Sequence, residues 1–392
     1  AVKSLRSLSF VLGLSMAALT AAQDNTVMRV GLFRDKAMKE VLVMSQRGAS
    51  EVFVDGVRKG ELMTTDGLKV TLANGKVQAR SLAFSFTGAD RLELRPHGSK
   101  AQLRITGVQP KLAERTYSGS ITLSVVAGEL LLVNEVAIED YVAGVVQSEA
   151  GKDKAPEYYK LQAESCRTYA LVNKRKHILD GFEVCDGVHC QVYRGHTTLP
   201  DIQAAVDATR RMVVVDANIR LIHATFHSNC GGETMNAEDL WSKSEPYLVS
   251  TMDSFCVASP HATWRKNIGR SQWLEYLRKT HGVDIADSNM VRAAVLFEPN
   301  CRELYISRLW PLVSLEQVRA DWKFNSAYFS IWPNGDQLVF EGRGFGHGVG
   351  LCQEGAMRMA ERGYSFTDIL HHYFADVHLM DLGSIDFFRD TE

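Results

Sequence analysis

The chain has 392 residues, of which 45% are hydrophobic and 23% charged, and its formal net charge is -2. This composition is that of a globular protein, long enough for two domains or for one large domain with a sizeable core. Nucleic-acid binding has no electrostatic support, because the proteins that bind the phosphate backbone carry an excess of Lys and Arg.

Residues 1–22 have the layout of a secretory signal peptide. Lys3 and Arg6 precede an apolar run from Leu8 to Leu19, and small residues follow before Gln23. The run is too short to span a bilayer, which takes about 18 apolar residues or more. An uncleaved signal anchor is the alternative. We expect export to the periplasm, the cell wall or the medium, with no membrane span after cleavage.

Residues 23–115 form a predicted β-rich N-terminal region. Polar and apolar residues alternate from Val27 to Phe33, and the pairs Asp55-Gly56 and Asn74-Gly75 are typical of tight hairpin turns. The region has no clustered His or Cys and no paired carboxylates. We interpret it as a scaffold or a module that docks to the cell wall.

The segment from Ile138 to Ala150 predicts a helix that carries a catalytic acid. Val142, Val145 and Val146 make an apolar stripe, and the next position on that stripe is Glu149. Burial without a cation raises the pKa of a carboxyl group, which turns it into a proton donor near neutral pH. The alternative is that Glu149 is exposed and idle in a frayed last turn.

A second helix is predicted to begin at Pro156 and to run to the basic residues 173–177. Arg167 lies one position off its apolar face. The side chain either turns inward to hold an anion or is solvated, and spacing alone favours the solvated state. We include Arg167 among the candidate substrate-binding residues.

The segment C-D-G-V-H-C predicts a metal site. Cys185, His189 and Cys190 put two thiols and an imidazole within six residues, so that they can converge on one tetrahedral ion, with His177 or water as the fourth ligand. In an exported protein, a disulfide between Cys185 and Cys190 is the alternative. The chain has seven cysteines, an odd number, and Cys230, Cys256 and Cys301 could pair in some combination.

Polar residues gather where the next predicted strand ends. Met212–Val215 and Ile219–Phe226 predict a hairpin, and F-H-S-N-C-G-G-E-T follows it. His227, Ser228 and Gly232 suit an edge that binds a sugar, since glycine lets the backbone approach a ligand. A tight loop with incidental polar residues is the alternative.

Alternating glycines mark the segment G-R-G-F-G-H-G-V-G-L-C-Q-E-G-A. If it is extended, glycines 342–350 leave one face of bare backbone, while His347 and its neighbours project from the other. The glycine spacing fits no nucleotide-binding fingerprint. Gln353 begins a predicted helix, and Ser365 with Asp368 predicts a capping box for another.

Five ordered motifs give the chain a resemblance to a known family. They are E-D-Y-V-A-G-V-V-Q-S-E, Q-A-E-S-C-R-T-Y-A-L, C-D-G-V-H-C-Q-V-Y, F-H-S-N-C-G-G-E-T and G-R-G-F-G-H-G-V-G-L-C-Q-E-G-A. Their series resembles the stage II sporulation protein D family, which includes amidase-enhancer-like proteins, from Thr116 to Phe374. Sporulation itself is not implied, because the broader family occurs in bacteria that form no spores.

The resemblance implies an α+β protein in which residues 116–385 form a mixed α/β catalytic domain with an active-site cleft. It implies a lytic transglycosylase that cleaves the MurNAc-GlcNAc bond of peptidoglycan glycan strands and leaves 1,6-anhydro-muramic acid ends. Glu149 would be the catalytic acid, and structural zinc would lie at Cys185, His189 and Cys190. The sequence departs from the family pattern at Ala150-Gly151 and at Cys166 and Cys352.

The five motifs also supply candidate residues for the substrate-binding groove of such an enzyme. The predicted substrate-binding residues are Arg167, Gln191, Tyr193, His227, Ser228, Gly232, His347 and Gln353. The alternative function is a non-catalytic protein that binds the cell wall and enhances an N-acetylmuramoyl-L-alanine amidase, which would then be its partner. A zinc hydrolase has less support, since the sequence has no H-E-x-x-H motif.

A single carboxyl group is enough for the chemistry expected here. Two-carboxylate glycosidases hold the pair roughly 5 to 9.5 Å apart, whereas Glu139 and Asp140 lie about 14 to 15 Å from Glu149 along a continuous helix. Glu149 would therefore act first as acid and then as base. A hydrolytic product would instead require a carboxylate from elsewhere, such as Asp186 or Glu233.

Overall fold

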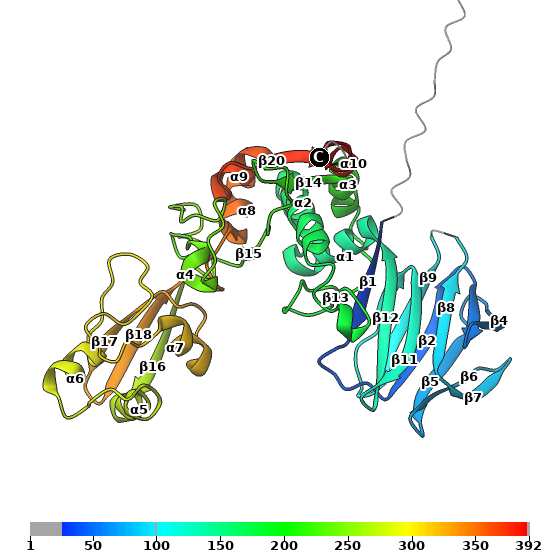
Figure 1. Cartoon of the computed structure of the whole chain (residues 1–392), viewed down its shortest axis with the longest axis horizontal. Helices are drawn as coiled ribbons and strands as arrows, with labels where there is room; N and C mark the ends of the chain where they lie inside the picture. The colour runs from blue at the N-terminus through cyan, green and yellow to red at the C-terminus, as the bar shows by residue number, and fades with distance from the viewer. Residues whose placement is uncertain (1–25, 99, 390–392) are drawn as a thin grey trace, which may run out of the picture.

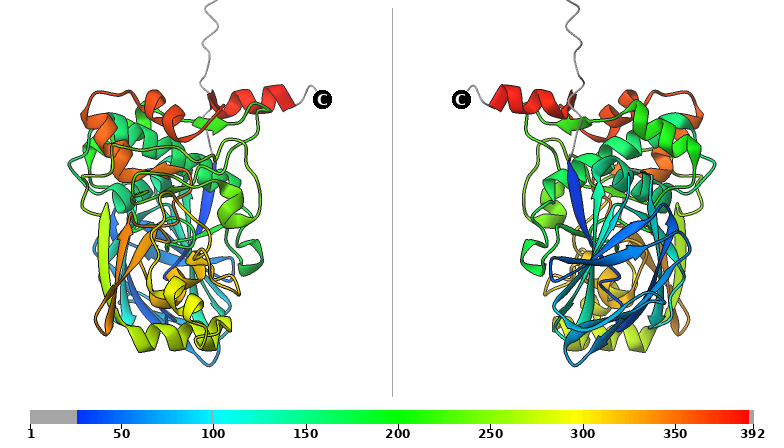
Figure 2. Two further views of the ribbon diagram at one scale, coloured as in Figure 1. Left: turned by 90° about the vertical axis from the view of Figure 1, so that its left-hand side faces the viewer. Right: turned by 90° about the vertical axis from the view of Figure 1, so that its right-hand side faces the viewer.

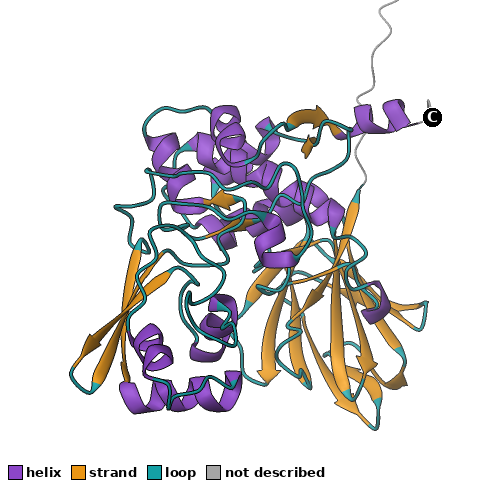
Figure 3. Ribbon diagram, turned by 60° about the vertical axis from the view of Figure 1, so that its left-hand side comes forward, coloured by secondary structure: helices purple, strands orange, loops and turns teal. Residues whose placement is uncertain are grey.

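The computed structural model describes residues 26–98 and 100–389, so the predicted signal peptide, residues 1–22, lies outside it. The molecule is elongated, with a β-sandwich at one end, a helical central part, and a small sheet with its own helices at the other end (Figure 1). Strands gather at the two ends and most helices between them (Figure 3). The chain is thus an α+β protein with a β-rich N-terminal region, as predicted. Within the part described, no helix has the length and apolar character needed to cross a membrane.

The N-terminal sandwich consists of two sheets packed face to face, and all their strand pairs are antiparallel except β1 with β13. Alternation places Val41 and Val43 of one strand in the shared core while their neighbours remain partly exposed. One sheet has the order β13-β1-β12-β11-β8-β3-β4 and the other β10-β9-β2-β5-β6-β7. The strands are β1 (Val27–Leu32), β2 (Glu40–Arg47), β3 (Ser50–Val54), β4 (Val57–Leu62), β5 (Gly67–Ala73), β6 (Lys76–Arg80), β7 (Ser85–Ala89), β8 (Arg91–Pro96), β9 (Gln102–Gln109), β10 (Arg115–Ser118), β11 (Ser120–Val126), β12 (Glu129–Ala137) and β13 (Val184–Cys185).

Both predicted hairpin turns are confirmed. Asp55-Gly56 joins β3 to β4 and Asn74-Gly75 joins β5 to β6, and all four residues have positive φ, as two-residue hairpins require. The sandwich continues through β11 and β12, so the expected boundary at residue 115 falls inside it.

The central part begins where β12 passes directly into helix α1 (Ile138–Ala150), with no loop between them. Val142, Val145 and Val146 are fully buried, which confirms the predicted apolar stripe. Helix α1 packs against α2 (Pro156–Val172) and α3 (Pro200–Ala208), and both begin with a proline, which suits the first turn of a helix.

The remaining elements of the central part are short. Their bounds are η1 (Ile178–Asp180), β14 (Met212–Val215), β15 (Phe226–His227), α4 (Ala237–Trp241), β19 (Leu351–Cys352), α8 (Gln353–Glu361), α9 (Phe366–Tyr373), β20 (His378–Asp381) and α10 (Leu382–Arg389). The predicted capping box of Ser365 and Asp368 is present at the start of α9. Helix α10 projects from the side of the helical part (Figure 2).

The predicted hairpin after Met212 is only partly formed. The chain turns back at Asp216, where an antiparallel bridge joins Val215 to Leu221 and the Ile222 N–H donates to the Val214 carbonyl oxygen. The regular ladder of strand β14 is instead antiparallel with β20, near the C-terminus, over four residue pairs. Arg211 forms a bidentate ion pair with Asp381 at the end of the β14–β20 ladder, which a local hairpin could not provide.

The glycine-rich segment is not extended beyond Arg343, contrary to our expectation. Gly344, Gly346, Gly348 and Gly350 all have positive φ, between 72° and 117°, so the chain turns at every second residue. At Gly346, where φ is 117°, a Cβ atom would lie 2.8 Å from the Cβ of His227. Only glycine fits both this backbone conformation and this approach.

Residues 263–343 form an insert with a separate core around Trp273, Phe329 and Phe340. Its sheet has the order β16-β18-β17. Arg302 fastens the insert to the central part, because its guanidinium donates to the carbonyl oxygens of Cys230 (2.5 Å) and Glu233 (2.7 Å). The elements are β16 (Thr263–Gly269), α5 (Arg270–Tyr276), the π-helix η2 (Leu277–His281), α6 (Ser288–Val295), α7 (Leu315–Trp322), β17 (Phe329–Asn334) and β18 (Gln337–Arg343).

Arg167 is neither solvated nor free to hold a substrate anion. Its side chain is 1% exposed, and its Nε and Nη2 atoms donate to the Glu139 carboxylate at 3.1 and 2.6 Å. Nη1 donates to the carbonyl oxygen of Met212. The guanidinium therefore joins the start of α1, the middle of α2 and the start of β14, and our substrate-binding prediction for it is corrected.

Replacing Arg167 by Met should lower the free energy of unfolding by about 3–5 kcal/mol, because it leaves the buried Glu139 carboxylate without its cation. The double variant Arg167→Met/Glu139→Leu should regain part of that loss, since it removes both charges. Urea unfolding of the wild type, both single variants and the double variant measures this. A loss of about 1 kcal/mol or less for Arg167→Met, as for an exposed pair, would contradict the buried pair.

Candidate active-site cleft

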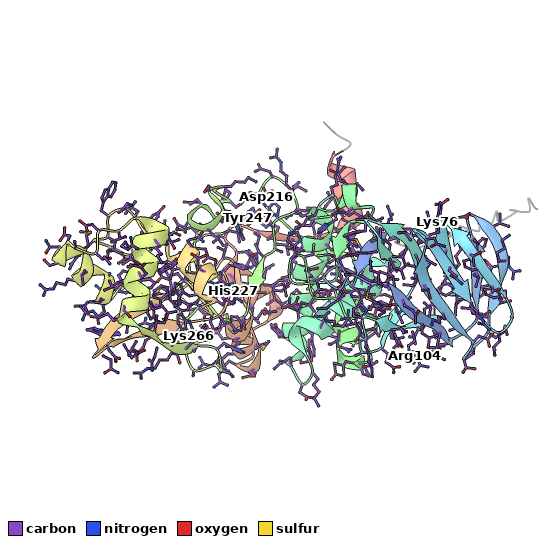
Figure 4. All side chains as sticks on the ribbon, turned by 90° about the horizontal axis from the view of Figure 1, so that it is seen from below. Lys76, Arg104, Asp216, His227, Tyr247 and Lys266 are labelled. Carbon is purple, nitrogen blue, oxygen red and sulfur yellow. The ribbon has the colours of Figure 1, made fainter. Side chains whose placement is uncertain are left out.

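A cleft with a volume of about 890 Å³ opens in the central part, and Arg319 of the insert reaches it. Its wall brings together residues from segments far apart in the chain, and His227 lies in the middle of the elongated molecule (Figure 4). The cleft wall includes Glu149, His189, Cys190, Val192, His227, Ser228, Trp241, Glu245, Arg319, Phe345, His347 and Gln353.

Glu149 lies in the cleft wall at the end of α1. It is partly buried, and its Oε1 accepts a hydrogen bond from the Val192 N–H at 2.7 Å. Burial raises the pKa of Glu149 above its ordinary value, although the Val192 hydrogen bond and the charge of Arg194 act to lower it. Glu149 is therefore not exposed in a frayed last turn, and its carboxyl group has the environment of a proton donor.

The last turn of α1 is held by the segment 192–198. Ser148 Oγ accepts from the Arg194 N–H at 3.0 Å, and Gln147 Oε1 accepts from Thr197 and Thr198. Gly144 allows this close approach, because a Cβ there would lie 2.1 Å from the Gly195 carbonyl oxygen. The orientation of Glu149 thus depends on a segment some 45 residues later, which no local pattern indicates.

Two neutral imidazoles, those of His227 and His347, lie next to each other in the cleft wall, with ring centroids 5.3 Å apart. Burial holds the pKa of His347 at about 4 and that of His227 well below its ordinary value. His347 donates from Nε2 to the Phe226 carbonyl and accepts at Nδ1 from the Val349 N–H, so it is fully bonded. His227 Nδ1 bonds the Val349 carbonyl and therefore carries the proton, which leaves Nε2 as an acceptor.

The cleft wall contains unsatisfied polar atoms. Among the described residues, Nε2 of His227 and Nε2 of Gln353 are buried without a hydrogen-bond partner. Buried polar groups are nearly always satisfied by protein or water, so such atoms call for a ligand or solvent. One is an acceptor and the other a donor, which suits the hydroxyl and amide groups of a sugar.

Three cleft residues were missed by our sequence analysis. Trp241 and Phe345 are 46% and 40% exposed and present aromatic surface to the cleft, and Arg319 reaches it from helix α7 of the insert. Phe345 stands within the glycine-rich motif, where an exposed aromatic residue between glycines was an available signal. Nothing near Trp241 or Arg319 in the sequence indicates that these residues meet Glu149.

Three other predicted substrate contacts lie outside the cleft wall. Tyr193 is fully buried against Tyr141, with ring centroids 5.1 Å apart, and its hydroxyl donates to Asn134, so it is a core residue. Gln191 is buried too and accepts a hydrogen bond from Tyr141. Gly232 lies in a loop where its carbonyl accepts from the Asp253 N–H. These predictions are corrected, whereas His227, Ser228, His347 and Gln353 do line the cleft.

The carboxylates that we named for a hydrolytic reaction are otherwise engaged. Asp186 is buried and accepts from Arg115 at 3.0 Å, and Glu233 accepts from the Arg302 N–H. Besides Glu149, the carboxylate that lines the cleft is Glu245. Burial acts to raise the pKa of Glu245, but hydrogen bonds with Lys243 and Tyr247 hold this pKa below its ordinary value.

The predicted metal-binding residues do meet, and His177 joins them. The ligand atoms of His177, Cys185, His189 and Cys190 all lie within 4.8 Å of one another. His177 Nε2 is 3.2 Å from His189 Nδ1, which in turn is 3.9 Å from Cys185 Sγ. A tetrahedral zinc ion needs ligand separations of about 3.4–3.8 Å, so the four donors fit such an ion.

Neighbouring groups orient these four side chains. Asp180 bonds Nδ1 of His177 at 2.8 Å, which turns Nε2 toward the cluster, as carboxylates often do behind a metal-binding histidine. The Cys190 thiol lowers the pKa of Cys185 through a hydrogen bond, and both thiols are free. Cys185 also pairs with Gly31 at the edge of the sandwich, so the cluster joins the N-terminal region to the cleft wall.

Sequence comparison finds relatives of this chain among known proteins. A family described as "Stage II sporulation protein" matches residues 126–215. Stage II sporulation protein D of Bacillus amyloliquefaciens is 30% identical over 268 residues, which cover 64% of this chain and 76% of that protein. The Bacillus subtilis (strain 168) protein of the same name is 29% identical over 280 residues (67% and 80%). The amidase enhancer of that strain is 23% identical over 281 residues (59% and 39%). The chain therefore belongs to the stage II sporulation protein D family.

Proposed function

We propose that this protein acts on the bacterial cell wall as a peptidoglycan lytic transglycosylase. The observation that carries the proposal is Glu149, a partly buried carboxyl group with a raised pKa in the wall of a large cleft. Relatives named stage II sporulation protein D and amidase enhancer support a role at the cell wall. The signal-peptide pattern supports export to that compartment.

Glu149 would act first as a general acid. Its proton passes to the glycosidic oxygen between MurNAc and GlcNAc, and the bond from that oxygen to the anomeric carbon breaks. The Glu149 carboxylate then takes the proton of the 6-hydroxyl of the same MurNAc, and the 6-oxygen bonds to the anomeric carbon. The carboxyl group is regenerated, no water is consumed, and a 1,6-anhydro end results. Ring closure is fast because the nucleophile belongs to the substrate itself.

The remaining cleft residues would bind the glycan. His227 Nε2 can accept from a sugar hydroxyl and Gln353 Nε2 can donate to a sugar oxygen, which would satisfy both atoms. The exposed rings of Trp241 and Phe345 offer apolar surface to the sugar faces. Arg319 adds a positive charge that suits the lactyl or stem-peptide carboxylates of MurNAc.

Replacing Glu149 by Gln should leave the fold intact and lower glycan cleavage at least ~10²-fold, because the variant has no proton to donate. Mass spectrometry of digested glycan strands measures this, and the wild type should give anhydro ends that lack one water relative to hydrolytic ends. Near-normal turnover by Glu149→Gln would contradict the assignment.

Glu245→Gln is the matched control, since it neutralises the other carboxylate of the same cleft. We expect nearly unchanged turnover and anhydro products, because Lys243 and Tyr247 already engage Glu245. Two carboxyl groups with pKa values shifted in opposite directions are also the pattern of a hydrolase. Reducing ends from the wild type, with loss of activity in Glu245→Gln, would establish that second candidate.

The amidase-enhancer relative favours a non-catalytic alternative. Under that alternative, the purified protein would bind glycan strands in the cleft without cleaving them. Added N-acetylmuramoyl-L-alanine amidase would then release stem peptides faster, and Glu149→Gln would enhance it as well as the wild type does. This set of results would replace the enzyme proposal.

The pH dependence of cleavage should reflect the protonation state of Glu149. The acid must be protonated, so kcat/KM should fall as the pH rises through the raised pKa of Glu149. Arg194→Gln removes a charge that lowers this pKa, and it should move the falling limb to higher pH, by less at high salt.

Arg265→Gln is the control for charge, because this exposed arginine pairs with Glu341 on the insert sheet and does not line the cleft. Its pH profile should match that of the wild type. A limb that moves to lower pH in Arg194→Gln would show that Glu149 is not the group being titrated.

We propose further that His177, Cys185, His189 and Cys190 bind a structural zinc ion. Two thiolates and two imidazoles are a common set of zinc ligands. All four positions come from the protein, so the ion would brace the cleft wall and the sandwich edge and take no part in bond cleavage. His189 and Cys190 line the cleft, which links the brace to substrate binding.

His189→Ala should lose the zinc ion of this cluster and melt at lower temperature, because metal-binding free energy is partly folding free energy. Cleavage should fall as well, as the wall loosens. Elemental analysis and thermal melting measure these effects, and His97→Ala, in the sandwich, should change neither. A wild-type protein with no metal in this cluster and a Cys185–Cys190 disulfide would contradict the proposal.

A further inference from the structure

A second group of metal-binding side chains lies in the interior of the central part. Cys230, Asp253, Cys256 and Cys352 are all completely buried, and their ligand atoms lie within 4.8 Å of one another. Our sequence analysis considered Cys230 and Cys256 only as disulfide partners and Cys352 only as a departure from a family pattern. It did not consider Asp253 at all.

Three separate segments supply these residues. Cys230 follows strand β15 after His227 and Ser228, and Cys352 ends strand β19 directly before Gln353 of helix α8. Strands β15 and β19 pair in parallel, which places His227 opposite Cys352. Asp253 and Cys256 come from one tight loop. The cluster therefore lies directly behind the cleft wall that carries His227, Ser228 and Gln353.

Backbone and side-chain donors hold the four groups in place. Asp253 Oδ1 accepts from the N–H groups of Phe255 (2.8 Å) and Cys256 (3.3 Å), and Oδ2 accepts from the Tyr373 hydroxyl (2.9 Å). Cys352 Sγ accepts from the N–H groups of Cys230 (3.3 Å) and Gly355 (3.4 Å). Backbone donors of this kind stabilise thiolates and resemble the outer shell of a metal site.

Burial makes an uncompensated cluster unfavourable. A carboxylate and three thiols, each able to become an anion, are buried together, and Asp253 forms no salt bridge with any described residue. Buried charges in proteins are normally paired or coordinate a metal. A divalent cation would neutralise the carboxylate and stabilise the thiolates together.

We propose that Cys230, Asp253, Cys256 and Cys352 form a second structural zinc site. Cys230 Sγ lies 3.4 Å from Cys256 Sγ and 3.3 Å from Asp253 Oδ2. A tetrahedral zinc ion with bonds of about 2.3 Å to sulfur and 2.0 Å to oxygen separates such ligands by about 3.5–3.8 Å. These two separations would thus widen by only a few tenths of an ångström, and all four ligand atoms already lie within 4.8 Å of one another. Each thiol that binds as thiolate releases its proton to solvent.

The types of ligand in this cluster indicate which metal it would bind and what role that metal would have. Three soft thiolates favour zinc over calcium or magnesium, which prefer oxygen ligands. Four protein ligands without solvent exposure are the pattern of a structural site, since a catalytic zinc keeps one position open. The four ligand atoms lie close enough together to bind a single ion. The site would fix β15, β19 and the start of α8, and with them one wall of the cleft.

The rival is a disulfide between Cys230 and Cys256, whose sulfur atoms are near enough to bond after a small shift. An exported protein meets oxidising conditions, in which such a bond forms readily. The two possibilities differ in metal content and in the number of free thiols. Both quantities can be measured on the full-length protein.

Purified wild-type protein should contain two zinc ions per chain by elemental analysis and native mass spectrometry, and seven free thiols after denaturation with a chelator. Cys352→Ser should lose one ion, His189→Ala the other, and the double variant both. Cys166→Ser replaces another buried cysteine that lies in neither cluster, and it should keep two. Asp253→Asn is a second test with nearly unchanged shape, in case Cys352→Ser does not fold.

X-ray absorption on the His189→Ala variant identifies the ligands of the remaining ion. We expect three sulfur atoms at about 2.3 Å and one oxygen at about 2.0 Å. A spectrum with two sulfur and two nitrogen atoms would assign the ion to the other cluster and overturn the proposal. So would a wild-type protein with one zinc ion that is lost in His189→Ala, or peptides joined by a Cys230–Cys256 disulfide.

Discussion

The hydrogen bond from the Val192 N–H to Glu149 is the contact on which the candidate site depends. Strand β12 leads into α1 without a loop, so the rigid sandwich determines where the last turn of α1 lies. The segment 192–198 then holds that turn through Gln147, Ser148 and Glu149. Burial and this single donor have opposite effects on the Glu149 pKa, and burial prevails. The raised pKa of Glu149 thus comes from burial and needs no neighbouring anion.

Local patterns predicted the elements that local interactions determine. The spacing of the valines predicted the helix that carries Glu149, and Asn74-Gly75 predicted the hairpin between β5 and β6. The errors concern partners distant in sequence: β14 pairs with β20 more than 160 residues later, and Arg167 pairs with Glu139 on another helix. Periodicity describes one segment at a time, so it indicates that Arg167 is near a core but not which carboxylate lies opposite.

A part of the candidate site could be predicted from the sequence only where one short motif contains its residues. His177, Cys185, His189 and Cys190 lie within fourteen residues and were named as potential ligands from spacing. The second cluster spans residues 230–352 across the insert, so its members have no common spacing. The proposed ions would lie behind two different parts of the cleft wall, one bound by His189 and the other behind His227 and Gln353. Neither proposed ion would take part in bond cleavage, which would depend on Glu149.

Strand β13 has a consequence for how the chain can be divided. This two-residue strand belongs to the central part but completes the sandwich sheet, where it lies in parallel beside β1. Strand β1, the first described element, therefore lies between β12 and β13, with a neighbour from later in the chain on each side. The N-terminal region is then no independent domain on a tether. Evolution could exchange or delete the insert, whose core is separate, more readily than it could replace the sandwich.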